Sequence, residues 1–364
     1  MSISDKNIVK IIAVIWLSIA FLYLMRVPED MCTTDLYWHF QYTEFIVHKN
    51  KFPTTKDIGI AYHPPLYHFI NSFITPPITE SDKSFHIKMI KMLSVIYGLI
   101  AALLINWFLK NITNDNFTRL LVVLFIATTP AFFFTFTGYN NDSLATLLSI
   151  SISAISYKLY KNWSSSFAKL LFFLALAGVY TKYSVAWCII VICILCLFDF
   201  IRNKFHAGNQ IKIILILIFA VMSLMPWAIF HNYNSVGKLF PCLPVDEHLQ
   251  IGKFDLPQHI NTLKTILKIP FISYTPGEWK LPWAKPFFHE SSKASDYISY
   301  SLVSSIFGEY EFTKPDILFF WIIFWIHCAL YIFAIKEIFS SGITKTAGAY
   351  IFLRILYTFF ILLL

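Results

Sequence analysis

The stretch of residues 8–39, IVKIIAVIWLSIAFLYLMRVPEDMCTTDLYWH, contains a long apolar run followed directly by a polar segment. The run Ile8–Met25 is close to the roughly 20 apolar residues that a transmembrane helix needs. The segment after it contains Thr33, Thr34, Asp35 and His39. A carboxylate or an imidazole held against a bilayer costs free energy unless it has a partner or a role. This boundary therefore predicts a membrane anchor followed by a functional site.

The composition of the whole chain indicates the same class of protein. Hydrophobic residues make up 57% of the chain and charged residues 14%, which is typical of a polytopic membrane protein and excludes an ordinary soluble domain. The formal net charge is +8, but Lys and Arg lie in short segments between the apolar runs and form no basic face, which argues against a nucleic-acid partner. The six cysteines have no spacing typical of metal ligands.

Further apolar runs predict an all-α polytopic fold with about nine transmembrane helices. The predicted spans are Ile8–Met25, Ile87–Leu109, Leu120–Phe136, Leu144–Tyr160, Ala168–Tyr180, Val185–Phe200, Ile211–Phe230, Ile317–Phe339 and Ala347–Leu364. We expect residues 1–364 to form a single membrane-embedded domain, with a first outer loop at 26–86 and a long outer loop at 231–315 that contains an interfacial helix around 260–267. The last run is still apolar at Leu364, which leaves two alternatives open: a chain that ends in the membrane, or one that is truncated at its C-terminus.

The segment Pro64–Ile78 decides which loops share a side of the membrane. Apolar residues such as Phe69 and Phe73 fall on one helical face, and polar residues such as His68 and Asn71 fall on the other. The segment is too short to span, so we expect an interfacial helix that begins after the proline pair and lies flat. The positive-inside rule then assigns the Lys and Arg clusters between spans to the cytoplasmic side. The outer side receives residues 26–86, 138–143, 181–183 and 231–315.

Acidic residues lie at the predicted starts of two helices, both on the outer side of the membrane. Asp35 follows two threonines, with His39 one helical turn later on the same face, and Asp142 follows the turn at 138–141. The helix dipole keeps a carboxylate in a first turn ionised, which suits a proton acceptor or a cation ligand. The alternative for both acids is an ordinary cap at a wet helix end, and the alternative for His39 is an interfacial side chain.

A lysine lies in the outer turn between two apolar runs. This residue is Lys182, within the sequence VYTKYS at 179–184. A cation in this position can bind a phosphate group. The alternative is an interfacial anchor whose ammonium group reaches the membrane surface.

The ordered set of polar motifs resembles a known family. The motifs are TTDLYWH at 33–39, YHPPLYH at 62–68, GYNNDSLA at 138–145, TKYS at 181–184 and SSIFGEYEF at 304–312. This set is similar to that of the polyprenyl-phosphate-sugar glycosyltransferases, the superfamily of the protein O-mannosyltransferases and the lipid A aminoarabinose transferases. Their fold is the C-type glycosyltransferase fold, and the resemblance covers the chain from Ile8 to about Lys314.

The resemblance implies a role for each matching residue. It implies that Asp35 contacts or deprotonates the acceptor and that Asp142 supports the same catalytic site. It implies that His63 belongs to the motif of the juxtamembrane helix and that Lys182 lies near the lipid phosphate. We expect the substrate-binding residues to be His39, His63, Tyr67, Lys182 and Tyr183. The chain departs from the aminoarabinose transferases, which have an acidic-basic pair where Tyr62-His63 stands, and from many eukaryotic protein mannosyltransferases, because Leu36 and not Glu follows Asp35. No cofactor is required by these motifs, and the need for a divalent metal ion stays open.

The expected reaction moves a sugar from a polyprenyl-phosphate donor to an unidentified protein, lipid or glycan acceptor. We expect a multi-pass protein of the bacterial inner membrane with a periplasmic site, or of the endoplasmic reticulum membrane if the source is eukaryotic. The alternative is a flippase for lipid-linked sugars or another transporter, which would need polar residues deep in the bundle and broken helices. The predicted spans contain few charges and show no internal repeat, which favours the enzyme. A catalytically inactive scaffold is a third alternative.

Overall fold

The computed structural model describes residues 4–26, 36–74, 83–111, 113–202, 208–237 and 239. All of them belong to one compact unit, Met1–Pro244, and every regular element in these ranges is a helix. The second unit, Val245–Leu364, lies outside the described residues. The spans predicted at Ile317–Phe339 and Ala347–Leu364, and the interfacial helix predicted around 260–267, fall in that second unit and stay predictions.

The described helices confirm a multi-pass integral membrane protein. Four helices are long and apolar enough to cross a membrane: α1 (Asp5–Arg26), α4 (Lys83–Leu109), α9 (Val185–Arg202), and α10 (Gly208–Met222) together with its continuation through α11 (Met225–Trp227), η4 (Ala228–Tyr233) and α12 (Asn234–Val236). A fifth is formed if α5 (Asn116–Thr128) and α6 (Pro130–Thr137) are counted as one span bent by 64°. The bend occurs at Thr129-Pro130, because proline has no backbone N–H with which to continue the preceding helix.

Two further predicted spans form helices of a different character. The span predicted at Ala168–Tyr180 forms α8 (Ser165–Thr181), which is apolar but has only 17 residues. The span predicted at Leu144–Tyr160 forms α7 (Asp142–Lys161), whose serines are buried among the neighbouring helices α4, α8 and α9. Two of these serines back-bond to carbonyls one turn earlier, Ser151 Oγ to Leu147 O and Ser153 Oγ to Ser149 O, both at 2.8 Å, so these two hydroxyls are satisfied within the helix. The helix is central because its small side chains let three neighbours approach.

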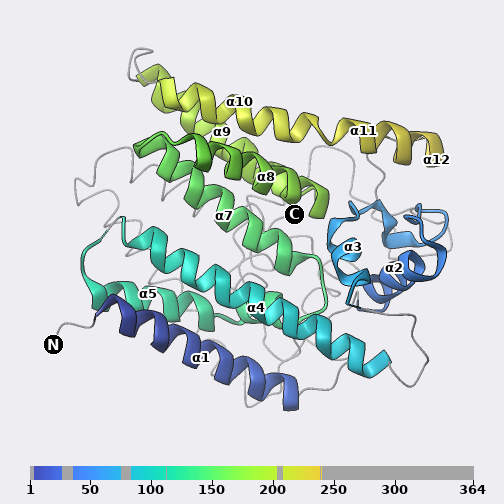
Figure 1. Cartoon of the computed structure of the whole chain (residues 1–364), viewed down its shortest axis with the longest axis horizontal. Coiled ribbons are helices and arrows are strands. Elements are labelled where there is room, and N and C mark those ends of the chain that lie inside the picture. The colour runs from blue at the N-terminus through green and yellow to red at the C-terminus, as the bar shows by residue number, and fades with distance from the viewer. Residues whose placement is uncertain are drawn as a thin grey trace, which may run out of the picture. The chain divides into compact units, whose positions relative to one another are not determined.

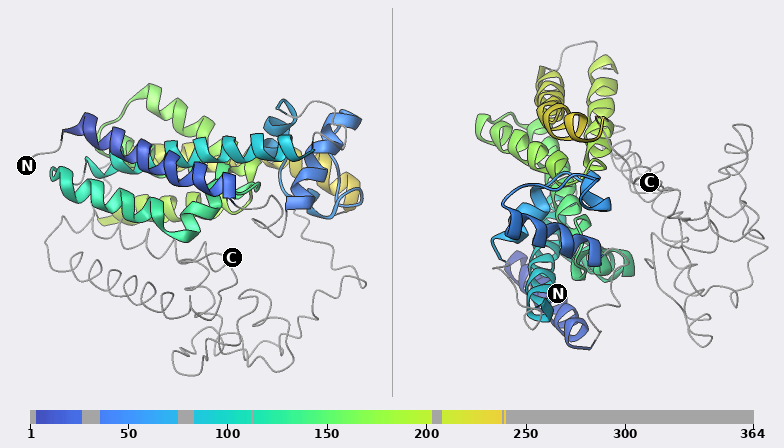
Figure 2. Two further views of the ribbon diagram at one scale, coloured as in Figure 1. Left: turned by 90° about the horizontal axis from the view of Figure 1, so that it is seen from below. Right: turned by 90° about the vertical axis from the view of Figure 1, so that its right-hand side faces the viewer.

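The helices lie side by side with consecutive long helices running in opposite directions (Figure 1). Three short elements, α2 (Leu36–Lys49), η2 (Gly59–Tyr62) and α3 (Leu66–Ser72), gather at one end of this bundle, as the left view of Figure 2 also shows. We call this end, where α7 begins and α8 ends, the site end. We call the other end, where α1 and α5 begin, the opposite end.

The segment between α1 and α4 leaves and returns at the site end. Helix α1 ends there and α4 begins there, while α3 has seven residues and is about 10 Å long, too short to cross a bilayer. Helix α3 begins after Pro65, as the proline pair predicts. The outer turns predicted at 138–143 and 181–183 therefore lie at the same end as α2 and α3, which the spacing of apolar runs predicts only if Pro64–Ile78 does not span.

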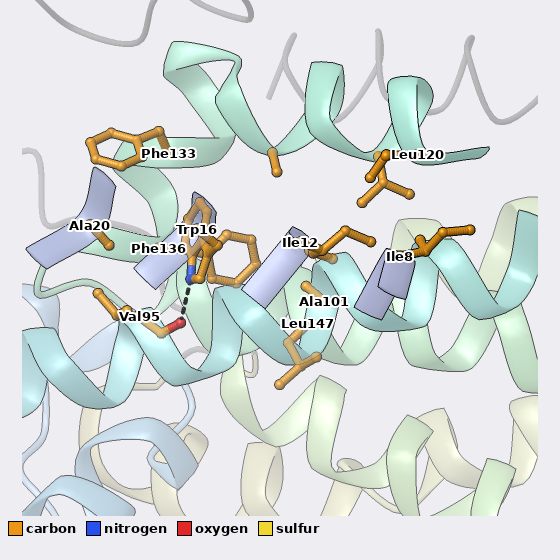
Figure 3. Packing of buried hydrophobic residues seen from close by; sticks show 13 residues of the cluster. Ile8, Ile12, Trp16, Ala20, Val95, Ala101, Leu120, Phe133, Phe136 and Leu147 are labelled. Atoms are coloured by element: carbon orange, nitrogen blue, oxygen red, sulfur yellow. Dashed lines mark hydrogen bonds between the residues drawn. The ribbon is translucent and has the colours of Figure 1, made fainter. Parts of the chain in front are cut away.

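Close packing around Trp16 fixes α1, α4 and α6 together (Figure 3). The indole Nε1–H donates to the Val95 carbonyl at 2.9 Å, and the ring lies edge-on against Phe133 and Phe136. Gly98 makes this crossing possible, because a Cβ there would lie 2.3 Å from Trp16 Cζ2 and 2.7 Å from Phe136 Cβ. This packing holds the end of α6, and with it the turn that leads to Asp142.

Charged residues in two of the predicted spans are buried, which the sequence analysis did not foresee. The Lys91 side chain in α4 is 2% exposed and the Asp199 side chain in α9 is 5% exposed. Asp199 Oδ2 accepts hydrogen bonds from Tyr160 Oη at 3.0 Å and Gln210 Nε2 at 2.7 Å, so the carboxylate ties α7, α9 and α10 together. The buried Asp199 carboxylate is thus compensated by polar partners on adjacent helices.

Candidate functional site

Helix α3 turns its polar face toward the protein. His68 and Asn71 are fully buried, whereas Phe69 is 40% and Phe73 is 74% exposed. The amphipathic pattern of the sequence is present, but its polar half faces α2 and not water. An inverted pattern of this kind suits a helix whose outer surface meets lipid and whose inner surface lines a polar site.

Three histidines meet where α2 packs against η2 and α3. His39 Nδ1 lies 3.4 Å from His68 Nε2, within hydrogen-bonding distance. The His63 ring is nearly parallel to that of His39, with centroids 6.3 Å apart, and the Tyr42 ring stacks on His68 at 3.9 Å. Since His39 comes from α2 and the other two from the YHPPLYH segment, this histidine cluster depends on tertiary contact between the two elements.

Burial keeps the histidine cluster neutral. Desolvation lowers the pKa of His39 from 6.5 to about 3, with a smaller opposing effect from Asp142. Desolvation also lowers the pKa of His63 and His68 well below 6.5, and the Lys182 cation adds to the effect at His63. At neutral pH each ring therefore has one N–H donor and one acceptor nitrogen.

A hydrogen-bonded tyrosine joins the cluster to the turn at 138–143. Tyr139 Oη donates to Thr43 Oγ1 at 2.8 Å, and Thr43 Oγ1 lies 3.3 Å from His68 Nδ1. The turn is also fixed to α4, because Ser94 Oγ donates to Ser143 Oγ at 3.2 Å. These contacts set the position at which α7 begins.

The first residue of α7 forms an ion pair with the residue that follows α8. Lys182 Nζ lies 2.5 Å from Asp142 Oδ1. The Asp142 side chain is 48% and the Lys182 side chain 24% exposed, so the pair borders the buried histidines without being enclosed. Both charges act on the His39 ring. The α8 helix ends at Thr181, so that the lysine leaves the helix axis and its side chain reaches across to α7.

The extension of α10 closes another side of this end. Asn232 Nδ2 donates to Tyr183 Oη at 3.1 Å and to the Leu239 carbonyl at 2.9 Å. His231 Nε2–H donates to the Pro53 carbonyl at 3.1 Å, and the Trp227 ring stacks on His231 at 4.0 Å. Both Asn232 and His231 lie in the π-helix η4, a helix type that is frequent at functional sites.

Some buried polar atoms at this end have no hydrogen-bond partner within the described part of the chain, and two of them belong to residues beside the ion pair and the histidine cluster. These two are His63 Nδ1 and Asn141 Nδ2, in residues that are 9% and 1% exposed. Buried polar groups in native proteins are nearly always satisfied by protein, water or ligand. These atoms therefore indicate where a polar ligand group can bind.

The structure brings together most of the residues that the sequence nominates. His39, His63, Tyr67, Asp142, Lys182 and Tyr183 all lie at the site end, with the Tyr67 ring 6.1 Å from that of His39. Asp35 directly precedes α2 but lies outside the described residues. The catalytic and binding roles of all these residues stay predictions.

The sequence analysis missed four residues of the network. Tyr42, Thr43, His68 and Tyr139 connect the nominated residues to one another. The available signal was spacing, because Thr43 lies one turn after His39 on α2 and His68 falls on the polar face of α3. The sequence pattern alone predicts that this polar face is exposed to solvent. Only its burial in the structure identifies the face as part of the site.

Within the residues that the structure describes, no group of three or more His, Cys, Asp or Glu side chains is arranged to hold a metal ion. The need for a divalent metal stays open, because Asp35 is not among those residues. No model of a known protein family matches this chain, and no curated protein matches it at a significant level.

Proposed function

We propose that this protein is a membrane glycosyltransferase that moves a sugar from a polyprenyl-phosphate donor to an acceptor. The observation that carries the proposal is the Asp142–Lys182 ion pair at 2.5 Å, which is partly exposed and whose charges act on the buried rings of His39 and His63. It combines a carboxylate, a cation and neutral hydrogen-bonding groups at the end of a bundle of apolar helices. A donor with its tail in lipid and its sugar at the membrane surface needs a site of this kind.

The ion pair supports a specific order of events. Lys182 is held by Asp142 before the donor binds, and a phosphate group brings negative charge that competes for the ammonium group. Lys182 then stabilises the polyprenyl phosphate as it departs from the anomeric carbon. Asp142, released from the lysine, accepts a proton from the attacking hydroxyl or amine, a role typically worth about 10²–10⁴-fold in rate.

Asp35 is the second candidate for the base. It directly precedes α2, on which His39 lies one turn later, so the chain brings a carboxylate to the same neighbourhood. Whether Asp35 or Asp142 takes the proton is decided by comparing the two asparagine variants. The acid whose replacement lowers turnover more is the base.

The wider architecture in this proposal is the C-type glycosyltransferase fold with about nine spans, in which 1–364 forms one domain. The site end is the periplasmic side of a bacterial inner membrane, or the lumenal side of the endoplasmic reticulum. Lysines at the opposite end support this orientation: Lys110 directly follows α4, Lys158 and Lys161 lie in the last turn of α7, and Lys169 lies near the start of α8.

The decisive experiment uses purified protein in lipid vesicles with polyprenyl-phosphate sugars labelled in the sugar. Transfer of label to water or to an added glycan, lipid or peptide is expected. The matched variants are Asp142→Asn, which should abolish most of the transfer, and Glu44→Gln, which removes an exposed acid of α2. Absence of transfer with every donor, from protein that is folded and correctly oriented, would reject the proposal.

One observation favours a transporter as the second candidate. The 64° bend between α5 and α6 makes a discontinuous helix, and discontinuous helices form the binding sites of many transporters. A transporter would move the intact labelled lipid between leaflets without releasing or transferring its sugar. The same vesicles measure both processes, because an impermeant reagent reports which leaflet contains the lipid and extraction reports whether the sugar is still attached.

A further inference from the structure

The hydrogen bonds around Thr43 determine which atoms of the histidine cluster are donors and which are acceptors. Tyr139 Oη lies 2.8 Å from Thr43 Oγ1 and 3.4 Å from the His39 carbonyl, so its proton goes to the threonine oxygen. Thr43 Oγ1 in turn lies 3.1 Å from the His39 carbonyl, the usual back-bond of a helical threonine, and 3.3 Å from His68 Nδ1. The Thr43 hydroxyl therefore donates to the nearer of these two atoms, the His39 carbonyl oxygen.

This polarity leaves a single arrangement for His68. The Thr43 oxygen has given its proton to the His39 carbonyl, so its contact with His68 requires His68 Nδ1–H to be the donor. A neutral imidazole has one N–H group, and His68 Nε2 is therefore an acceptor. The Tyr42 ring, stacked on His68 at 3.9 Å, holds the imidazole in this orientation.

The same reasoning then fixes His39. His68 Nε2 is an acceptor, so His39 Nδ1–H must donate across the 3.4 Å contact. The lone pair of His39 is left on Nε2, at the edge of the ring away from His68. Within the described residues, the hydrogen bond of the His39 ring is made through Nδ1 and not through Nε2. The charges of Asp142 and Lys182 both act electrostatically on this ring, so His39 is coupled to the ion pair.

We propose that Tyr139, Thr43 and His68 act as positioning residues that hold His39 in the tautomer protonated at Nδ1, so that Nε2 accepts a hydrogen bond from a hydroxyl group of the bound sugar. The assignment of that hydroxyl rests on the proposed function, whereas the tautomer does not. Burial keeps the imidazole neutral, so the acceptor is available at neutral pH. Metal-binding histidines are oriented in a similar way, because a hydrogen bond from one ring N–H leaves the other ring nitrogen free to act as the ligand.

The first test reads the tautomer directly by nitrogen NMR on protein labelled with ¹⁵N-histidine in lipid bilayers. Protonated and unprotonated imidazole nitrogens have well-separated shifts, and the signals that disappear in His39→Gln belong to His39. We expect Nδ1 to be the protonated nitrogen. A His39 protonated at Nε2 would overturn the inference whether or not the protein transfers sugar.

The second test breaks the chain of hydrogen bonds. Thr43→Val removes the acceptor of His68 Nδ1–H and should let part of the His39 population shift its proton to Nε2, while Thr43→Ser should keep the wild-type tautomer. Thr128→Val is the matched control, because Thr128 Oγ1 makes the same kind of back-bond to the Leu124 carbonyl, at 2.7 Å, in α5. A His39 signal that is identical in Thr43→Val and wild type would overturn the positioning role.

The third test concerns the ligand. Polyprenyl-phosphate mannose should shift the His39 Nε2 signal, and polyprenyl phosphate without a sugar should not. In transfer assays, Thr43→Val should raise the donor KM about fivefold, the loss expected for one neutral hydrogen bond, and Thr43→Ser should restore it. Retention of the labelled lipid on the protein measures binding separately. If the mannose lipid is retained without a change at Nε2, the acceptor role is wrong. If it is not retained at all, the donor class in the proposed function fails, and the tautomer is judged by the first two tests.

Discussion

The two ends of the helix bundle each contain an aspartate paired with a lysine, but the surroundings of the two pairs differ. At the opposite end, Asp5 pairs with Lys110 at 2.5 Å and with the guanidinium group of Arg119, which Asn116 also contacts. At the site end, the Asp142–Lys182 pair lies beside buried neutral imidazoles, and its charges act on the rings of His39 and His63.

This difference distinguishes an ion pair that holds helices together from one that is suited to bind a ligand. Asp5 begins α1, Lys110 follows α4 and Arg119 lies in α5, so the first pair connects three helices. Arg119 is 2% exposed and would be left as a buried charge without Asp5. The site-end pair connects only α7 with the turn after α8, its Lys182 cation is less deeply buried than Arg119, and it has neutral hydrogen-bonding groups beside it. A ligand can replace one partner there without leaving a charge buried.

Exchanging each aspartate for asparagine should give the largest contrast. Asp142→Asn removes the carboxylate of the site end, and sugar transfer should fall by about 100-fold or more. Asp5→Asn should leave turnover per folded molecule within about twofold, because it is far from the reacting groups, but should lower the Tm. Turnover and thermal unfolding of the two variants, measured in the same vesicles, check the contrast. Equal losses of turnover would remove the functional distinction between the two ends.

Mild acid should act on the site end through the histidine cluster. The folded-state pKa values of His39, His63 and His68 lie below the unfolded value of 6.5, so the unfolded chain binds more protons as the pH falls. Stability is therefore highest above about pH 6.5 and is lost as the pH decreases through the range down to the folded pKa values. Between pH 7.5 and 5.5, protonation of these imidazoles in the unfolded chain should therefore lower the free energy of unfolding.

The pH dependence of the Tm between 5.5 and 7.5 is the measurement for this prediction. His68→Gln should make the slope shallower, even if the variant is less stable at every pH. His48→Gln, which removes an exposed histidine of the same helix α2, serves as the control and should keep the wild-type slope. A wild-type Tm that does not change over this range would show that the cluster is not held neutral.

Replacing the two lysines tests whether phosphate recognition is confined to the site end. Lys182→Ala should raise the donor KM about tenfold, as expected for loss of one hydrogen bond to a charged group. Lys182→Arg should keep part of the affinity, because it retains the charge with a different geometry. Lys110→Ala at the opposite end should leave the KM unchanged. If the two alanine variants behave alike, Lys182 is an interfacial anchor and not a phosphate ligand.

Single cysteines at the two ends should react with a thiol reagent from opposite sides of the membrane. Of all the variants proposed, these two should change activity least. In a background without the native cysteines, Lys56→Cys at the site end should react with an impermeant thiol reagent from outside. Ser165→Cys at the opposite end should react only after the membrane is opened. Both positions are exposed, so reactivity reports sidedness and not burial. Labelling of Ser165→Cys from outside would invert the orientation and with it the lumenal or periplasmic site.

The sequence by itself determined the class of protein and where most helices lie. Apolar runs such as Ile8–Met25 and Ile87–Leu109 became α1 and α4 with small changes at their ends, because the length and hydropathy of a membrane helix are local properties. The pair Pro64-Pro65 predicted the start of α3 for a similar reason, since proline restricts the backbone locally. The nomination of Asp142 and Lys182 also used only local features, a helix start and a polar turn.

Only the tertiary structure decided how these residues are used. The sequence could not reveal that Asp142 pairs with Lys182, 40 residues away, because which helix ends become neighbours depends on packing such as that of Gly98 against Trp16. It could not reveal that the polar face of α3 is buried, since an amphipathic pattern gives the direction of a face but not what covers it. Nor could it determine the chain from Tyr139 through Thr43 and His68 to His39, because the direction of each hydrogen bond depends on distances between separate elements.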